Sequence, residues 1–189
     1  NKDTNPMDDH GHGTHVAATA AGNGILKGVA PDAKIYAYKV LDSGGSGYSS
    51  DVIAAIDRSV DPNQDGNYND HLDIISLSLG GSGNPDDPSS TAIDNAVKNG
   101  VVAVISAGNS GPGSGTIGSP GTARRAITVG ATDKTDIIAS FSSRGPTSIK
   151  AVKPDLTAPG VSICAAQWDS AWVANLCYDT KHVSISGTS

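Results

Sequence analysis

The stretch Val101-Val102-Ala103-Val104-Ile105-Ser106-Ala107 decides the fold. It is a nearly continuous run of apolar, largely β-branched side chains, which is typical of a strand in a parallel sheet that helices cover on both faces. The turn Gly108-Asn109-Ser110-Gly111 ends this run at once. The segment therefore predicts a buried strand with a polar turn at its carboxyl end.

Strands and helices alternate on both sides of this segment. Further strands are predicted at Ala33–Leu41, Leu72–Leu79 and Ile127–Ala131, and amphipathic helices at Ser50–Val60 and Ser90–Lys98. This alternation indicates the α/β fold class, with a doubly wound, mostly parallel sheet and helices on both faces. At 189 residues the chain suits one substantial core, so we expect residues 1–189 to form a single domain.

Glycine-bordered segments follow three of the predicted strands. In open α/β sheets, ligands collect at the carboxyl ends of the strands. Extended backbone bordered by glycine lets a peptide approach and pair as an added strand. The candidate substrate-binding residues are Gly45, Ser46, Gly47, Ser78, Leu79, Gly80, Ala107 and Gly108. The alternative is that each segment is only a tight turn between a strand and a helix.

Asn109 stands at the end of the central strand, between Gly108 and Ser110. A side-chain amide held there can direct its NH₂ group at an oxygen beside the sheet, which is what an oxyanion-hole donor does. Asn109 is therefore a candidate catalytic residue.

Three histidines stand close together in Asp9-His10-Gly11-His12-Gly13-Thr14-His15-Val16-Ala17. The small side chains after them, up to the stop signal Gly22-Asn23-Gly24, predict a buried helix with His12 in its first turn. The positive end of the helix dipole disfavours the imidazolium, so His12 would be a neutral general base near pH 7. A zinc site and a purely structural role are the alternatives, although a zinc helix would need a glutamate and a different histidine spacing.

Four segments together resemble signatures of the subtilisin-like serine peptidase family, the subtilases. They are His12–Ala17, Ser78–Gly81, Ser106–Asn109 and the last residues, Gly187-Thr188-Ser189. The resemblance implies a three-layer α/β fold and a serine endopeptidase that works through an acyl-enzyme. It implies that His12 is the base, Ser189 the nucleophile and Asn109 the oxyanion donor. Ala139–Pro146 and Lys153–Val161 resemble connecting segments of the family, with no expected chemistry of their own.

The resemblance also places Gly113–Gly118 beside the primary specificity pocket. Gly118 at the base of this pocket would leave it roomy, so we expect broad specificity with a preference for large apolar side chains. The same stretch fits the dinucleotide fingerprint G-x-G-x-x-G, but Pro120 follows and prevents the helix that this fingerprint must open. Polypeptides are the expected substrates, an N-terminal propeptide is a further expected partner, and the parent protein is expected to be secreted.

One member of the family's triad has no counterpart in these residues. The family's aspartate lies in an Asp-Ser/Thr-Gly turn ahead of the histidine, whereas Asp3, Asp8 and Asp9 lie too close to His12 in sequence to take its place. We therefore expect residues 1–189 to be the central part of a catalytic domain, without the aspartate segment and the helix after Ser189, and to be inactive in isolation. A non-catalytic relative that binds peptides or calcium is the alternative.

The loop from Asp61 to Asp70 carries oxygen-bearing side chains at alternate positions, with Gly66 in the sixth, as in the first half of an EF-hand loop. Leu72 stands where an EF-hand has its glutamate. Calcium is the predicted cofactor, because some subtilisin-like enzymes carry calcium loops at this place; an acidic, solvated loop is the alternative. The candidate ligands are Asp61, Asn63, Asp65, Asn67 and Asp70.

Charge and composition argue against a nucleic-acid-binding or membrane-spanning protein. With 13 basic and 19 acidic side chains the net charge is -6, and no basic run exceeds Arg124-Arg125, so no nucleic-acid partner is expected. No apolar run reaches the length of a membrane span, and a monomer is expected. Cys164 and Cys177 are compatible with a disulfide, with two buried free thiols as the alternative.

Overall fold

The computed structural model describes residues 5–189. Two compact units make up the chain. We call Ser49–Val161 with Ser186–Ser189 the sheet unit, and the chain up to Tyr48 with Ser162–Ile185 the hairpin unit. Each unit is described by itself, and the expectation of a single domain stays a prediction.

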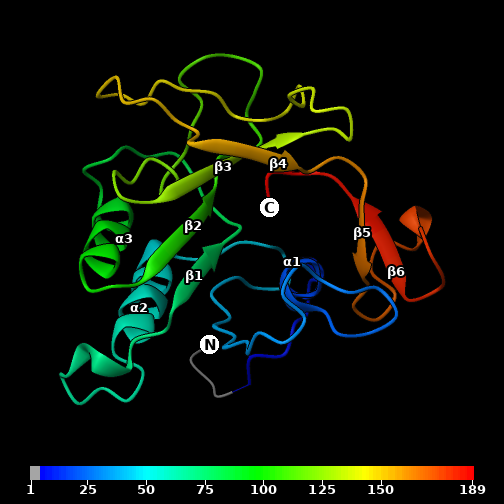
Figure 1. The fold of residues 1–189 in the computed structure, drawn as a ribbon, viewed down its shortest axis with the longest axis horizontal. Coiled ribbons are helices and arrows are strands. Elements are labelled where there is room, and N and C mark those ends of the chain that lie inside the picture. Colours follow the sequence, from blue (N-terminus) through cyan, green and yellow to red (C-terminus); the bar gives the residue numbers. More distant parts are fainter. Residues whose placement is uncertain (1–4) are drawn as a thin grey trace. The chain divides into compact units, whose positions relative to one another are not determined.

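A four-stranded parallel sheet organises the sheet unit (Figure 1). Its strands are β1 (Ile74–Leu77), β2 (Val102–Ser106), β3 (Ile127–Thr132) and β4 (Leu156–Pro159), in the order β1-β2-β3-β4. Every neighbouring pair is parallel, with Ile75 opposite Ala103 and Ile105 opposite Thr128. The predicted α/β fold class with a mostly parallel sheet is confirmed.

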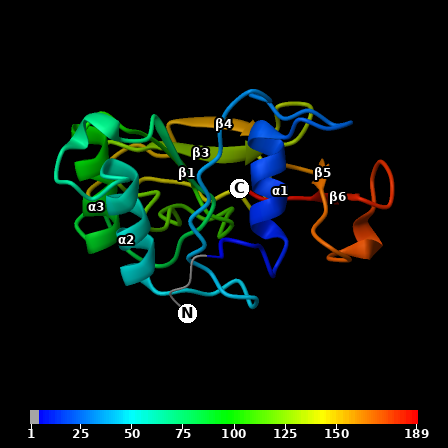
Figure 2. The same ribbon diagram turned by 90° about the horizontal axis from the view of Figure 1, so that it is seen from below.

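Helices α2 (Ser49–Val60) and α3 (Pro88–Lys98) belong to the same unit and lie side by side in Figures 1 and 2. The start of α3 is fixed by Asp87, whose carboxylate accepts a hydrogen bond from the backbone N–H of Ser90 at 2.9 Å. Pro88 follows in the first turn, where a missing N–H costs nothing. A short 3₁₀ helix, η1 (Tyr68–Asp70), precedes β1.

The core of the sheet unit is formed by branched aliphatic side chains from both kinds of element. Ile56 of α2, Ile93 of α3 and Ile105 of β2 are almost fully buried, as is Val101 just before β2. Burying such a side chain stabilises the fold by about 1.5–3 kcal/mol relative to leaving it exposed. Along the central apolar run Val101, Ala103 and Ile105 are buried while Val102 is 44% exposed, so alternate residues pack in this core and the continuous burial that the sequence predicts is not observed in the sheet unit.

In the hairpin unit, helix α1 (His12–Ala21) contacts β5 (Ile163–Ala166), which pairs antiparallel with β6 (His182–Ile185). The 3₁₀ helix η2 (Val173–Asn175) lies in the connection between the two strands. A disulfide joins Cys164 to Cys177. The predicted disulfide is thus present, and the alternative of two free thiols is wrong.

Two predictions for the hairpin unit are wrong. Within the described chain, residues 33–41 form no strand, and Ile35 and Tyr36 are 54% and 62% exposed. Alternation predicts which side chains share a face, but a strand also needs a partner, and this segment pairs with none in its unit. Helix α1 is mostly half-buried rather than buried, with His15 its one fully buried side chain. No helix among residues 5–189 is long and apolar enough to cross a membrane.

Candidate active site

Asn109 is held by the residue next to the predicted nucleophile. Its side-chain Oδ1 accepts hydrogen bonds from the backbone N–H of Thr188 at 2.9 Å and from the Thr188 hydroxyl at 3.0 Å. That hydroxyl in turn accepts from the backbone N–H of Gly108 at 3.1 Å. Because both donors occupy Oδ1, the Nδ2 side of the exposed amide is left for another acceptor.

Ser189 lies against the predicted substrate-binding segment. Its Oγ is 3.5 Å from the backbone oxygen of Ser78, and the Ser78 hydroxyl is 3.4 Å from the backbone oxygen of Ser189. Ser78 directly follows β1, and Asn109 follows β2. The sheet unit therefore brings three predicted segments together at the carboxyl ends of adjacent parallel strands, as such sheets favour.

The backbone at Ala107 and Gly108 is largely used within the protein. Ala107 N–H donates to Val129 O at 2.9 Å, which extends the β2–β3 pairing. Gly108 donates to Thr188, and its carbonyl accepts from Ser143 N–H at 2.9 Å. For Leu79 and Gly80, which lie just beyond β1, no backbone hydrogen bond occurs within the described sheet unit. Peptide pairing at these positions stays a prediction.

Gly118 meets the backbone of Gly81 across an antiparallel bridge. The bridge joins Gly81 to Ser119, whose N–H and C=O groups exchange hydrogen bonds of 2.9 Å with those of Gly81. A Cβ on Gly118 would lie 2.5 Å from Gly81 O, closer than real Cβ atoms come. Glycine at this position is therefore required by a backbone approach, which is a reason separate from the roominess predicted for the pocket.

His12 occupies the first turn of α1 and is half-buried. Burial lowers its pKa, and the nearby His10 and His15 lower it further, while the Asp8 carboxylate acts in the opposite direction. The N-terminal end of the helix dipole also disfavours the charged ring. His12 is therefore neutral at pH 7, which is the protonation state that a general base needs.

Asp8 fixes the start of α1. Its carboxylate accepts from the backbone N–H groups of His10 (2.9 Å), Gly11 (2.8 Å) and Thr14 (2.7 Å), and from the Thr14 hydroxyl (2.7 Å). Partial burial works toward a higher pKa, but these four donors hold the pKa of Asp8 far below its usual range. Local sequence patterns do not predict this role, because Asp8 lies three residues before the N-cap residue Gly11 and not at the capping position itself.

His15 fastens α1 to the β5–β6 hairpin. Its Nε2 lies 3.1 Å from Ile163 O and 3.2 Å from Val183 O. Carbonyl oxygens only accept, so Nε2 carries a proton and donates to both. His15 is thereby a structural histidine, and it is buried.

His10 completes the surroundings of His12. Its ring packs edge-on against Trp172, with centroids 5.6 Å apart, and its centroid lies 6.5 Å from that of His12. No group of three or more His, Cys, Asp or Glu side chains among residues 5–189 could hold a metal ion. The zinc alternative for these histidines therefore has no support.

The segment Gly45-Ser46-Gly47 is a closed turn in the hairpin unit. Ser46 donates its N–H to the Asp42 carboxylate at 3.0 Å and accepts from Asp42 N–H at 2.8 Å. Gly45 N–H donates to Asp42 O at 2.9 Å. The structure thus gives this segment a turn conformation, and its role in substrate binding stays a prediction.

The candidate calcium loop is ordered by its own carboxylates. Asp61 accepts from the N–H groups of Asp65 (3.2 Å) and Gly66 (3.0 Å), and Asn63 Oδ1 accepts from Asp65 N–H at 2.8 Å. The side chain of Asn63 also donates to Asp65 at 3.1 Å. Asp61, Asn63 and Asp65 therefore lie close together, but no group of three or more acidic, histidine or cysteine side chains among residues 5–189 is placed to hold a metal ion, so calcium binding by this loop stays a prediction. Asn67 caps η1, and Asp70 lies within it.

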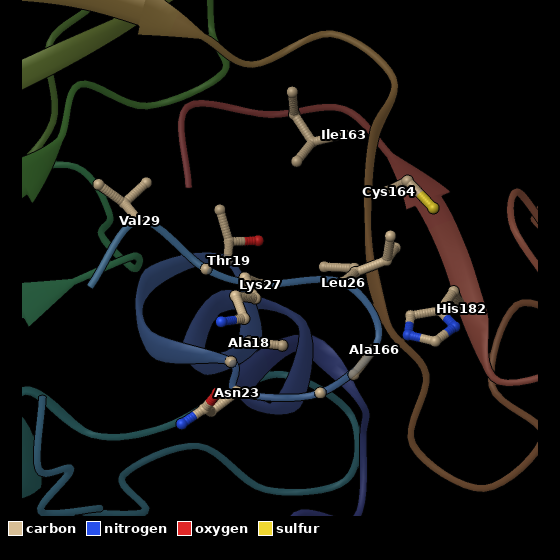
Figure 3. A pocket seen from close by; sticks show the side chains of 14 residues that line it. Ala18, Thr19, Asn23, Leu26, Lys27, Val29, Ile163, Cys164, Ala166 and His182 are labelled. Carbon is tan, nitrogen blue, oxygen red and sulfur yellow. The ribbon is translucent and has the colours of Figure 1, made fainter. Parts of the chain in front are cut away.

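A cavity of about 430 Å³ lies in the hairpin unit, and none of the predicted site residues is among those that line it. It is lined by the end of α1, the segment after it and β5; Figure 3 shows Thr19, Leu26 and Ile163 around it. His182, whose Nδ1 is 2.6 Å from Asp179, contributes to its wall.

Similarity to known proteins shows which family shares this sequence and geometry. The model of the subtilase family, Peptidase S8, matches residues 1–189. The chain belongs to the subtilase family. Serine protease AprX of Bacillus subtilis (strain 168) is 39% identical over 210 residues, which cover 100% of this chain and 47% of AprX. The minor extracellular protease Vpr of the same strain is 58% identical over 122 residues, which cover 64% of this chain and 14% of Vpr.

Solved structures of similar sequence agree with the subtilase assignment. Sphericase has a TM-score of 0.80 and 38% identity, covering 96% of this chain and 59% of Sphericase. S41 Psychrophilic Protease has a TM-score of 0.75 and 37% identity. The chain thus spans about half the length of AprX and less than two thirds of Sphericase.

Proposed function

We propose that the protein carrying this chain is a serine endopeptidase that cleaves polypeptides through an acyl-enzyme. The observation that carries the proposal is the junction of Ser189, Thr188 and Asn109 at the carboxyl ends of β1 and β2. A candidate nucleophile and an amide with an occupied Oδ1 stand there together. Membership of the subtilase family supports the same reaction.

In the proposed reaction, Ser189 Oγ attacks the peptide carbonyl carbon and its proton passes to His12. The carbonyl oxygen becomes an oxyanion, which the Asn109 amide and the Ser189 backbone N–H stabilise. The intermediate collapses as His12 gives the proton to the leaving amine. Water then loses a proton to His12 and attacks the acyl carbon, and the bond to Ser189 Oγ breaks as His12 returns the proton to that oxygen, which releases the carboxylic acid product. No residue among 1–189 is assigned as the triad aspartate, because no Asp-Ser/Thr-Gly turn precedes His12.

Substrate peptides are proposed to pair as an added strand along Ser78-Leu79-Gly80. The segment Gly45-Ser46-Gly47 is proposed as a second substrate-binding segment, and Gly118 is proposed to lie at the base of the specificity pocket. The backbone groups of Leu79 and Gly80, which make no hydrogen bond within the described sheet unit, support this pairing. Large apolar side chains are the proposed preference. A peptide library that is cleaved strictly after small or charged residues would contradict it.

Three further properties belong to this proposal. The loop Asp61–Asp70 binds calcium as a structural ion, supported by the clustered oxygens of Asp61, Asn63 and Asp65. The protein is secreted, as the name of the extracellular relative Vpr suggests, and a disulfide suits an oxidising compartment. It acts as a monomer, matured from a form with an N-terminal propeptide.

Covalent labelling with a fluorophosphonate probe tests the function. The protein is expressed from its complete gene, and labelling is measured as the increase in intact mass. We expect one adduct, located at Ser189, that is lost in Ser189→Ala and His12→Ala. A folded protein that neither labels nor cleaves casein would instead be a non-catalytic peptide- or calcium-binding relative.

A further inference from the structure

Ser143 lies beneath the turn that carries Asn109. It belongs to the segment Phe141-Ser142-Ser143-Arg144, for which the sequence predicts no chemistry. Its Oγ accepts a hydrogen bond from the backbone N–H of Ser110 at 3.0 Å. Its own N–H donates to the carbonyl of Gly108 at 2.9 Å. Ser143 thus holds the chain on both sides of Asn109 through bonds to the backbone of its two neighbours.

This arrangement leaves little freedom to the turn. Ser143 is 1% exposed, so its hydroxyl has no water as an alternative partner. Gly108 has a φ of +100°, a left-handed conformation that favours glycine. A Cβ on Gly108 would lie 3.0 Å from Ser143 Oγ. Glycine and serine are therefore packed as a pair, and the backbone direction at Asn109 depends on both.

Thr188 holds the other end of the same residue through the Asn109 Oδ1. Backbone and side chain of Asn109 are thus fixed by different residues from distant parts of the sequence. A donor that stabilises an oxyanion must be aimed before the charge develops, since reorientation during the reaction would cost part of its effect.

We propose that Ser143 is a positioning residue for the oxyanion hole, because it fixes the backbone on both sides of Asn109 and so the direction of the Asn109 amide. This inference rests on the proposed function, in which that amide binds the oxyanion. The Ser143 hydroxyl, which holds Ser110, acts on the reaction through Asn109.

A double-mutant cycle tests this claim, with kcat and KM measured on a peptide anilide in the protein expressed from its complete gene. We expect Ser143→Ala to lower kcat about tenfold, as loss of one hydrogen bond allows, with KM changed less than about twofold. Asn109→Ala lowers kcat about 10²- to 10³-fold, a magnitude known from subtilisin. Adding Ser143→Ala to Asn109→Ala should then change kcat by less than about twofold.

Ser142→Ala is the matched control. Ser142 is equally buried, and its Oγ accepts from the backbone N–H of Ala131 on β3, at 3.0 Å. The Ser142→Ala variant should lower thermal stability as much as Ser143→Ala does, while its kcat should equal that of the wild type. If Ser143→Ala fails to fold, Ser143→Cys, which keeps a weak acceptor at the same place, enters the cycle and should retain an intermediate kcat.

Two results overturn the inference: a Ser143→Ala enzyme with the kcat of Ser142→Ala, or a full additional loss of activity in the double variant. Either result shows a structural role only, while the wild type still cleaves and Asn109→Ala is still impaired. A wild type that neither cleaves nor labels overturns the proposed function itself, and is recognised before any variant is made.

Discussion

The carboxylate of Asp8 accepts hydrogen bonds from both the backbone N–H and the hydroxyl of Thr14, each at 2.7 Å. Thr14 lies two residues after His12 in the first turn of α1. The same carboxylate also holds the N–H groups of His10 and Gly11. The start of the helix that carries the proposed base is therefore set by one ionised side chain.

Replacing Asp8 should destabilise the protein in a pH-dependent way. We expect Asp8→Ala to lower the free energy of unfolding by about 1–2 kcal/mol at pH 7, the usual effect of losing a cap. The pKa of Asp8 is depressed in the folded state, so its contribution is present above the unfolded pKa of about 4 and is lost as the pH falls below it.

Urea unfolding at pH 7 and pH 3 measures this difference, which should shrink at pH 3. Asp9→Asn is the control, since Asp9 makes only an exposed ion pair with Lys39 and such pairs contribute about 0–1 kcal/mol. An equal loss for Asp8→Ala at both pH values would mean that the charge of Asp8 is irrelevant.

The acid limb of the pH–activity profile should reflect the surroundings of His12. Burial, His10 and His15 lower its pKa, so these neighbours should hold the midpoint of kcat/KM lower than it would be without them, while a triad aspartate acts in the opposite direction. His10→Gln removes a like charge and should move the midpoint upward. His71→Gln, in the sheet unit, should leave it unchanged. A midpoint that stays fixed or moves down in His10→Gln would show that His10 does not act on His12.

Reduction of the disulfide should loosen the hairpin unit. Cys164 and Cys177 are 13 residues apart, and closing a loop of this size stabilises the folded state by about 3 kcal/mol in the chain-entropy model. We expect Cys164→Ser/Cys177→Ser to unfold at lower denaturant, as followed by tryptophan fluorescence. A reductant should shift the wild type to the same midpoint and leave the double variant unmoved. Equal midpoints for oxidised wild type and double variant would contradict this.

Gly118→Ala should disturb the bridge to Gly81. The new Cβ would lie 2.5 Å from Gly81 O, so the backbone must shift at a cost of about 1–3 kcal/mol. Because this bridge borders the proposed pocket, KM for apolar peptides should rise more than kcat falls. Gly113→Ala, whose Cβ would meet only Thr116 Cγ2 at 3.8 Å, is the control. The same KM in both variants would remove Gly118 from the pocket.

Calcium should raise stability through the loop Asp61–Asp70. At a calcium concentration a hundred times the dissociation constant, binding stabilises by about 2.7 kcal/mol. We expect chelator-treated protein to bind calcium with heat in a calorimeter and to gain melting temperature. Asp65→Asn should weaken both effects, and Asp136→Asn, outside the loop, should not. If calcium gives neither heat nor a higher melting temperature in the chelator-treated protein, the loop does not bind calcium and is only an acidic, solvated loop.

Local patterns predict the elements whose formation depends on their own residues. The amphipathic spacing before Val60 predicts a helix from Ser50, and α2 begins at Ser49. The run around Val104 becomes β2, one residue shorter at each end. Residues 33–41 alternate equally well but form no strand, because alternation contains no information on a pairing partner.

For the candidate site too, residues in local motifs could be predicted from the sequence, whereas residues that act through long-range contacts could not. Asn109 and Ser189 stand in recognisable motifs, and the structure brings their segments together. Ser143 and Thr188 act through contacts with residues far away in the sequence, so no local pattern could indicate their hydrogen bonds to the Asn109 turn. Gly118 was expected for the space that it leaves, whereas the structure shows a backbone approach that only glycine allows.

The four-residue strand β1 separates two very different loops. The Asp61–Asp70 loop precedes Ile74, at the amino end of the strand, while Ser78 follows Leu77 at the other end. Lengthening a surface loop costs little closure entropy. The amino end is consequently where this protein can gain, lose or exchange residues over evolution, or accept an engineered insertion, while the geometry around Asn109 remains unaltered.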